Sequence, residues 1–396
     1  YSEPLPGMGR YTPLYKDVSV DWVSYLRGKG YVIPEEPSEL YAKKVEGTDW
    51  KDGAETPLPL AIEAEDNETH FMVDECIGWI NAQTRPWVTH LSLLRPHPPF
   101  AAPEPYNSRY DPATLTPPTR QTSKDREAEQ HPYLRHCLEN TRYGSTIPSA
   151  DDNGLDRDIQ QAQSQYYGLM NEVDDNLGRL IESLKANGSW DSTLIIFTSD
   201  HGEQMGDHWL TGKLGYFDQS YYVPLIIRDP RVSADATRGK QIEAFTENVD
   251  IMPTMLDWLG CDIPTQCDGY SLMPMINTGK APSFWRKEVH WECDFRDIII
   301  DNELHNLDLT AHQCNLAVIR DEHYKYVHFT ALPPLFFDLR ADPGELNDLA
   351  GDPSYHAIML TYLQKMMSWR MNYTDRALTE ISLTEDGPVT RRSALT

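Results

Sequence analysis

Basic side chains are scarce in this sequence. Its 396 residues carry 35 lysines and arginines against 61 aspartates and glutamates, which gives a formal net charge of −26. Non-specific affinity for nucleic acids comes from basic contacts to phosphates and the release of counterions, so this balance excludes nucleic-acid binding over the whole surface. A local cationic pocket for a small anion is compatible with it.

Long apolar runs and closely paired cysteines are lacking too. No stretch approaches the roughly 18 to 20 apolar residues that cross a bilayer, so we expect no membrane partner. No two of the six cysteines form a Cys-x-x-Cys pair. Such sparse thiols are typical of a reducing compartment, which predicts a cytoplasmic protein. The cysteines are Cys76, Cys137, Cys261, Cys267, Cys293 and Cys314.

A long helix followed by a short apolar strand is predicted in the middle of the chain. Apolar residues recur every three or four positions over 159–185, which predicts a helix with one buried face, and Asn187-Gly188 supplies a left-handed stop. The β-branched run 193–198 is too short for a helix and is typical of a strand buried on both faces. This order predicts a parallel sheet with helical crossovers.

Similar segments occur on both sides of this pair. A helix over 71–80 and a strand over 87–94 are predicted before it, and a strand over 223–227 and a helix over 250–259 after it. Pro224 makes the strand an edge or bulged strand. Asp250 is a candidate N-cap for the helix. The Pro-rich, charged stretch 95–152 predicts a long irregular excursion.

The pattern changes after Pro282. Short strands without long helices between them are predicted over 288–292, 316–320, 324–329 and 335–339, followed by a closing helix over 355–369. This is typical of an antiparallel sheet. We therefore predict a catalytic α/β domain over residues 1–282 and an antiparallel α+β subdomain over 283–396.

The segment 198–213 carries most of the chemistry. Asp200 and His201 stand at the carboxyl end of the predicted buried strand, where open α/β sheets place their ligand sites. An oxygen and an imidazole ligand at that position could reach one ion, and neighbouring glycines would let the backbone turn around it. Lys213 is a compact cation that could hold an anionic substrate.

Several sequence segments, taken in their order along the chain, resemble the sulfatase branch of the alkaline phosphatase superfamily. The matching segments are Gly168-Leu-Met-Asn-Glu-Val-Asp-Asp175, Thr193-Leu-Ile-Ile-Phe-Thr-Ser-Asp-His-Gly-Glu203, Gly206-Asp-His208, Gly212-Lys213, Val249-Asp-Ile-Met-Pro-Thr254 and Phe337-Asp-Leu-Arg-Ala-Asp-Pro-Gly344. Within that branch the sequence looks most like the phosphonate monoester hydrolases, also described as phosphodiesterases. Two features carry this: Asp200-His201 replaces the Asp-Asn pair of arylsulfatases, and Leu94-Arg-Pro-His-Pro-Pro-Phe100 matches the subgroup's active-site histidine loop.

The resemblance implies a fold and a set of roles. The fold would be an alkaline-phosphatase-like three-layer αβα sandwich with a smaller C-terminal antiparallel subdomain. Asp200 and His201 would bind one divalent metal ion, for which the mixed oxygen and nitrogen donors favour Mn²⁺ or Zn²⁺ over Ca²⁺ or Mg²⁺. His97 would protonate the leaving group, and Lys213 would neutralise charge on a small anionic ester. A homo-oligomer is expected from the relatives.

The family nucleophile is the main departure. It is a cysteine oxidised to formylglycine, or a serine, in a Cys-x-Pro-x-Arg context, and none of the six cysteines here has that context. The chain also starts without methionine. We therefore expect the nucleophile and the first strand, with its metal-binding aspartate, to precede Tyr1, and this chain alone to have little hydrolase activity.

Three functions remain open from the sequence. The first is a metal-dependent hydrolase of phosphonate monoesters and phosphodiesters, promiscuous towards sulfate esters. The second is an aryl or alkyl sulfatase, and the third is an inactive fragment or homologue that lacks the nucleophile. His208 is expected to support the site loop rather than to react.

Overall fold

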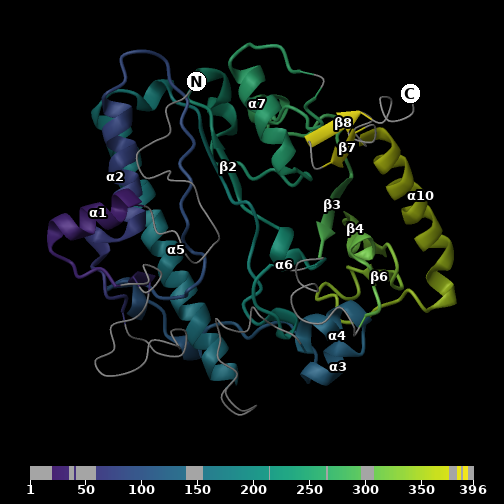
Figure 1. The fold of residues 1–396 in the computed structure, drawn as a ribbon. Helices are drawn as coiled ribbons and strands as arrows, with labels where there is room; N and C mark the ends of the chain where they lie inside the picture. Colours follow the sequence, from purple (N-terminus) through teal and green to yellow (C-terminus); the bar gives the residue numbers. More distant parts are fainter. Residues whose placement is uncertain are drawn as a thin grey trace. The chain divides into compact units, whose positions relative to one another are not determined.

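The structure is a computed structural model, and its described residues fall into two compact units (Figure 1). It describes residues 20–34, 40–41, 59–139, 155–213, 215–264, 266–295, 307–373, 381–384 and 387–390. The first unit comprises Tyr1–Glu127, Cys137–Leu214 and Asp218–Val232, and the second Ala128–His136, Gly215–Phe217 and Ser233–Thr396. The domain boundary after residue 282 stays a prediction.

Two packed helices form the frame of the first unit. They are α2 (Glu68–Asn81) and α5 (Leu155–Ala186), and they pack against one another. Both predictions are confirmed, and α5 ends before Gly188 at φ +79°. Asn67 caps α2, because its side chain accepts a hydrogen bond of 2.7 Å from the Glu68 amide.

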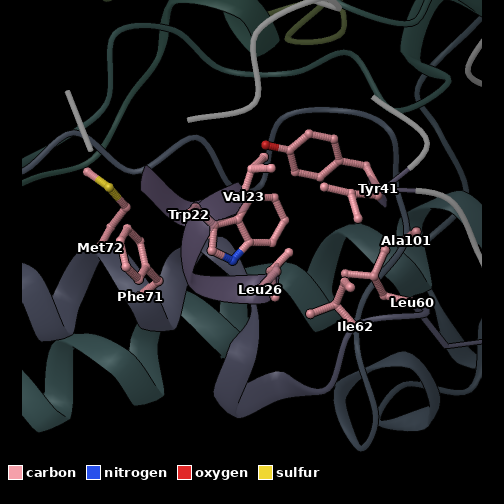
Figure 2. Close-up of a cluster of buried hydrophobic side chains, with 10 residues drawn as sticks. Trp22, Val23, Leu26, Tyr41, Leu60, Ile62, Phe71, Met72 and Ala101 are labelled. Carbon is pink, nitrogen blue, oxygen red and sulfur yellow. The ribbon is translucent and has the colours of Figure 1, made fainter. Parts of the chain in front are cut away.

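A hydrophobic core in the first unit contains Trp22, Leu60 and Phe71 (Figure 2). Trp22 and Leu26 of α1 (Val20–Lys29) are fully buried, and Tyr41 and Phe71 pack in the same cluster. Leu91, Leu93 and Leu94 pack against this cluster just before the loop that carries His97 begins. The cluster also contains Val23, Leu40, Leu60, Ile62, Met72 and Ala101.

The strand pairing of the first unit differs from the prediction. Strand β1 (Ile195–Thr198) is only half-buried and pairs antiparallel with β2 (Leu225–Arg228), with Ile195 opposite Arg228. A parallel crossover needs a connection that returns over the sheet, usually through a helix. The connection here contains the 3-10 turn Asp207–Trp209 and the four-residue helix α6 (Asp218–Tyr221). It turns back on itself, since the Gly202 amide donates to the Ser220 carbonyl.

Two further expectations were wrong in detail. Residues 87–94 form no strand, since they pair with no strand of the described residues, and their apolar side chains pack against two hydrophobic clusters. The excursion over 95–152 is not wholly irregular. It contains the 3-10 turns Tyr106–Ser108 and Pro112–Thr114 and the helices α3 (Lys124–Ala128) and α4 (Pro132–Glu139).

The second unit contains the predicted antiparallel sheet. Its strand order is β3 (Glu288–Asp294), β4 (Asn315–Asp321), β5 (Tyr324–Phe329) and β6 (Leu335–Asp338). Helix α10 (His356–Tyr373) covers it with Tyr362 and Met366, as the closing-helix prediction requires. The unit also holds α7 (Ile251–Trp258), α8 (Met273–Thr278) and the hairpin of β7 (Ile381–Thr384) and β8 (Gly387–Thr390).

Asp250 is structural, although it does not cap α7 with its side chain. The carboxylate is fully buried and accepts hydrogen bonds from the Glu247 and Tyr270 amides and from both terminal nitrogens of Arg286. Because Arg286 occupies the carboxylate, the side chain is not available to the first turn of the helix. Asp250 is thus the N-cap residue of α7 by position, as expected, but its side chain makes no hydrogen bond to the first turn of that helix.

The structure bears on two further features of the sequence, its apolar helices and its cysteines. None of the helices in the described part of the chain has the length and apolar character that a membrane crossing requires. None of the six cysteines is in a disulfide, as predicted.

His131 should make the free energy of unfolding pH-dependent. Its Nε2 donates to the Pro333 carbonyl and its Nδ1 accepts from the Tyr133 amide, so a second ring proton has no acceptor. Burial lowers its pKa from 6.5 to about 4. The unfolded chain therefore binds the proton more readily, so this stability is complete above about pH 7 and is lost as the pH falls from 6.5 towards 4.

The expected loss at His131 is about 2 kcal/mol between about pH 7.5 and pH 5. Urea unfolding should show this loss in the wild type and in the exposed control His312→Gln, but not in His131→Gln. Equal pH slopes in all three proteins would contradict it.

Candidate active site

Asp200 and His201 directly follow β1 and lie side by side. The Asp200 Oδ1 accepts from the His201 amide at 3.0 Å, and the His201 Nε2 lies 3.6 Å from the Asp200 Oδ2. The Ser199 hydroxyl donates to the His201 carbonyl at 2.8 Å and tightens the turn. The Asp200 side chain is 86% exposed, so its outer oxygen faces solvent.

The tautomer of His201 is set by the backbone. Its Nδ1 lies 2.8 Å from the Gly202 carbonyl, which only accepts, so Nδ1 carries the proton. The Nε2 lone pair then points towards the Asp200 carboxylate. An imidazole held in this way is the usual form of a metal-ligating histidine.

A glycine is required directly after His201. A Cβ at Gly202 would lie 2.1 Å from the Gln219 carbonyl oxygen, because the strand-end segment and the segment before β2 approach each other there. The chain then forms a hairpin that returns to the site, since the Gln204 amide donates to the Gly212 carbonyl at 2.7 Å. This hairpin places Lys213 back beside the strand end.

Glu203 is bound to this hairpin next to Lys213. Its Oε1 accepts from the Gly212 amide, one residue before Lys213. Burial raises the pKa of Glu203 to about 7, against the opposing effect of Lys213. Burial also lowers the pKa of Lys213, while Glu203 and Asp200 oppose this. Carboxylate and ammonium therefore stabilise each other's charge in a half-buried position.

His97 belongs to the same electrostatic neighbourhood. Its Nδ1 donates to the Pro98 carbonyl at 2.7 Å, so the ring lone pair is on Nε2. Burial lowers its pKa, and the positive charges of Lys213, His201 and Arg95 lower it further. The structure thus brings His97, Lys213 and His201 together from segments more than 100 residues apart in sequence.

The donor atoms fit a divalent metal ion, although the described residues supply only part of a coordination shell. A carboxylate oxygen and an imidazole nitrogen face each other at 3.6 Å, which suits Mn²⁺ or Zn²⁺. Within the described ranges there is no group of three or more histidine, cysteine, aspartate or glutamate side chains that could hold a metal. Asp200 and His201 are therefore two candidate ligands of an incomplete set.

His208 is a buried support, in line with expectation. Its Nδ1 pairs with the Glu127 Oε1 at 2.9 Å, and both side chains are fully buried. His208 has φ +54°, in the left-handed region, at the tip of the hairpin that ends at Lys213. The Glu127 contact therefore fixes the hairpin tip.

Sequence reasoning missed Glu203, Arg95 and Glu127. Glu203 lies two residues after His201 and could have been noticed as a second acidic group in the motif. Arg95 lies two residues before His97 in the same Pro-rich loop, but its burial to 3% exposure has no sequence signal. Glu127 is paired with His208 across 81 residues, and a single sequence does not record such a contact.

Comparisons with known proteins give consistent matches. Residues 27–261 match the family described as Sulfatase, and residues 206–372 match N-sulphoglucosamine sulphohydrolase, C-terminal. The chain is 43% identical over 374 residues to the multifunctional alkaline phosphatase superfamily protein PehA of Trinickia caryophylli, covering 93% of this chain and 71% of that protein. It is 27% identical over 313 residues to an arylsulfatase of Clostridium perfringens, covering 78% of this chain and 59% of that protein.

Two solved structures are similar over nearly the whole chain. The phosphonate monoester hydrolase of Agrobacterium radiobacter matches with a TM-score of 0.79 at 40% identity, covering 94% of this chain and 73% of that one. The phosphonate monoester hydrolase SpPMH from Silicibacter pomeroyi matches with the same TM-score and coverage at 34% identity. These matches confirm the predicted α/β architecture with a C-terminal antiparallel sheet.

Proposed function

Because the chain belongs to the sulfatase family of hydrolases within the alkaline phosphatase superfamily, we propose that the protein containing it hydrolyses phosphonate monoesters and phosphodiesters. The observation that carries this proposal is the similarity to two phosphonate monoester hydrolases over 94% of the chain, with the Asp200-His201 pair at the end of β1. Enzymes of this family act on ester bonds and use a divalent metal ion. The substrate class and the ion are the proposed part.

Asp200 and His201 would hold the metal ion. The Asp200 Oδ2 and the His201 Nε2 are the atoms proposed to bind it, with Mn²⁺ or Zn²⁺ favoured by the mixed donors. When bound, such an ion polarises a non-bridging oxygen of the ester and favours the ionised nucleophile. We assign the nucleophile to no residue of this chain.

His97 would act on the leaving group. With Nδ1 donating to the Pro98 carbonyl, a proton on Nε2 can be passed to the departing oxygen. The lowered pKa makes protonated His97 a stronger acid than an ordinary histidine. A bound anionic ester would favour the protonated form, since a nearby opposite charge raises the pKa of a histidine.

Lys213 would bind the equatorial oxygens of the reacting group. Its half-buried ammonium is worth more to a developing negative charge than an exposed one would be, because water screens it less. The charge of Glu203 favours the protonated form of this lysine, because it raises the pKa of Lys213 against the lowering effect of burial, and its carboxylate holds the adjacent Gly212 amide.

Sulfatase activity is the second candidate. The similarity to the arylsulfatase of Clostridium perfringens favours it, and sulfate and phosphate esters share a tetrahedral anionic transition state. The Asp200-His201 pair favours the phosphorus esters. Turnover of matched phosphonate and sulfate monoesters with one leaving group separates the two, because a higher kcat/KM for the sulfate ester would overturn the first proposal. No turnover of either ester would support an inactive homologue.

His97→Ala provides the residue-level test of this function. We expect kcat to fall by about 100-fold or more for an alkyl leaving group and by only a few-fold for a nitrophenyl one, because nitrophenolate departs without a proton. The comparison is made in the protein that contains these residues, loaded with Mn²⁺. His90→Ala, an exposed histidine seven positions earlier, is the matched control and should behave as wild type. Equal losses for both leaving groups would contradict the acid role.

A further inference from the structure

Arg95 is a buried cation whose donors go to the loop around His97. Its side chain is 3% exposed. The Nη1 donates to the His97 carbonyl at 3.1 Å and to the Pro99 carbonyl at 2.8 Å, so one nitrogen bridges both ends of this tripeptide. The guanidinium carbon lies 4.8 Å from the centre of the Tyr41 ring. The loop therefore turns around Arg95.

Arg95 does not behave as an ordinary buried ion-pair partner. Glu68 and Glu172 are buried close enough for its charge to lower the pKa of each, against the raising effect of burial. Glu68 accepts from the Tyr41 hydroxyl and Glu172 from the Asn67 amide. The Nε and Nη2 of Arg95 have no hydrogen-bond partner among the described residues. Its hydrogen bonds thus serve the loop, while its charge balances the two carboxylates.

We propose that Arg95 is a positioning residue for His97: it fixes the His97–Pro99 backbone so that the free Nε2 of His97 faces the leaving group. The carbonyl that accepts from the His97 ring is that of Pro98, which lies between the two carbonyls held by Arg95. When Arg95 holds both neighbours, the Pro98 carbonyl is held too, and with it the ring tautomer. This inference rests on the proposed role of His97 as an acid.

A double-variant cycle tests the positioning role. Arg95→Lys is the main variant, because it keeps the charge beside Glu68 and Glu172 while its ammonium ends one bond short of the Nη1 position that donates to both carbonyls. We expect kcat for an alkyl phosphonate ester to fall by about 10- to 100-fold, with KM nearly unchanged and a much smaller fall for a nitrophenyl ester. In the His97→Ala background the same change should have no further effect on kcat, since Arg95 would act through His97.

Arg109 offers a matched control in the same excursion. Its guanidinium carbon lies 5.3 Å from the Tyr106 ring centre and it pairs with Asp175, so Arg109→Met also removes an arginine stacked on a tyrosine. This variant should retain wild-type kcat for both esters. Multiplicative losses in the Arg95 and His97 double variant, or equal losses for both leaving groups in Arg95→Lys alone, would overturn the positioning role.

A second measurement does not depend on turnover. In long-range ¹H–¹⁵N spectra at about pH 8, the His97 ring, assigned by its loss in His97→Ala, should be a single Nδ1–H tautomer in the wild type and in Arg109→Met. Arg95→Lys should show mixed tautomers. An unchanged His97 ring would overturn the proposal about Arg95. Failure of the acid role would instead appear in His97→Ala as equal losses for both leaving groups.

Discussion

Asp200→Ala is expected to abolish hydrolysis through loss of the metal ion. The Asp200 carboxylate is 86% exposed and its hydrogen bonds in the structure are with the adjacent Ser199 and His201, so its removal costs the fold little. Loss of an outer-shell partner already weakens metal affinity by about 10- to 100-fold, and loss of a direct ligand should weaken it by more than about 100-fold. Calorimetric titration of the protein with Mn²⁺ measures this loss of metal affinity without any substrate.

Asp191→Ala is the control for Asp200→Ala. Asp191 lies just before the other end of β1, is 94% exposed and has a cationic neighbour at 3.9 Å in Arg228. It should bind Mn²⁺ as the wild type does. Thermal unfolding of both variants should lie within a few degrees of the wild type. If Asp200→Ala retained wild-type Mn²⁺ affinity, the strand-end pair would not be the metal site.

Local sequence patterns were sufficient to predict most of the helices and the C-terminal sheet. Apolar spacing predicted α5, and short strand-like segments joined by polar turns predicted β3 to β6, because helical spacing and turn signals are local properties of the sequence. The same reasoning failed at β1. An apolar run of four to six residues does not record the direction of its partner, and the return of the chain through Gly202 and Ser220 decided an antiparallel pair.

The site residues were predicted by their resemblance to a family, and their supports were not. Asp200, His201 and Lys213 share one motif, and His97 was identified because its Pro-rich loop matches the histidine loop of the family. Glu203 and Arg95 act through contacts with backbone groups and Glu127 through a buried contact with the His208 ring, and no spacing rule reports such contacts. A single sequence therefore indicates reacting groups more readily than the groups that orient them.

The cationic group at Lys213 also reconciles an acidic protein with an anionic substrate. The net charge of −26 is spread over the whole chain, whereas the site gathers Lys213, His97 and His201 within one electrostatic neighbourhood. Surface charges more than about 10 Å away are largely screened at 0.1 M salt, while half-buried neighbours are not. Binding of a small anion is thus governed by the local arrangement.

Lys213→Met should cause the second large loss. The ammonium is half-buried and its charge lowers the pKa of Glu203, so its removal takes away charge stabilisation in the transition state and leaves the Glu203 carboxylate without this neighbouring cation. We expect kcat/KM to fall by about 100- to 1,000-fold, by analogy with the loss of one oriented donor to a developing charge. The loss should be similar for alkyl and nitrophenyl leaving groups, because Lys213 would act on the non-bridging oxygens, in contrast to His97.

Glu203→Gln separates the charge of Lys213 from its position. The glutamine can still accept from the Gly212 amide, so the hairpin is kept while the negative charge is removed. Without that charge the pKa of Lys213 should fall further, since Glu203 raises it. The single variant should therefore lose activity at high pH first, and in the Lys213→Met background the same change should restore part of the loss by removing an unpaired buried carboxylate. An unchanged pH profile in Glu203→Gln, or no loss in Lys213→Met, would contradict the assignment of Lys213 to the reacting oxygens.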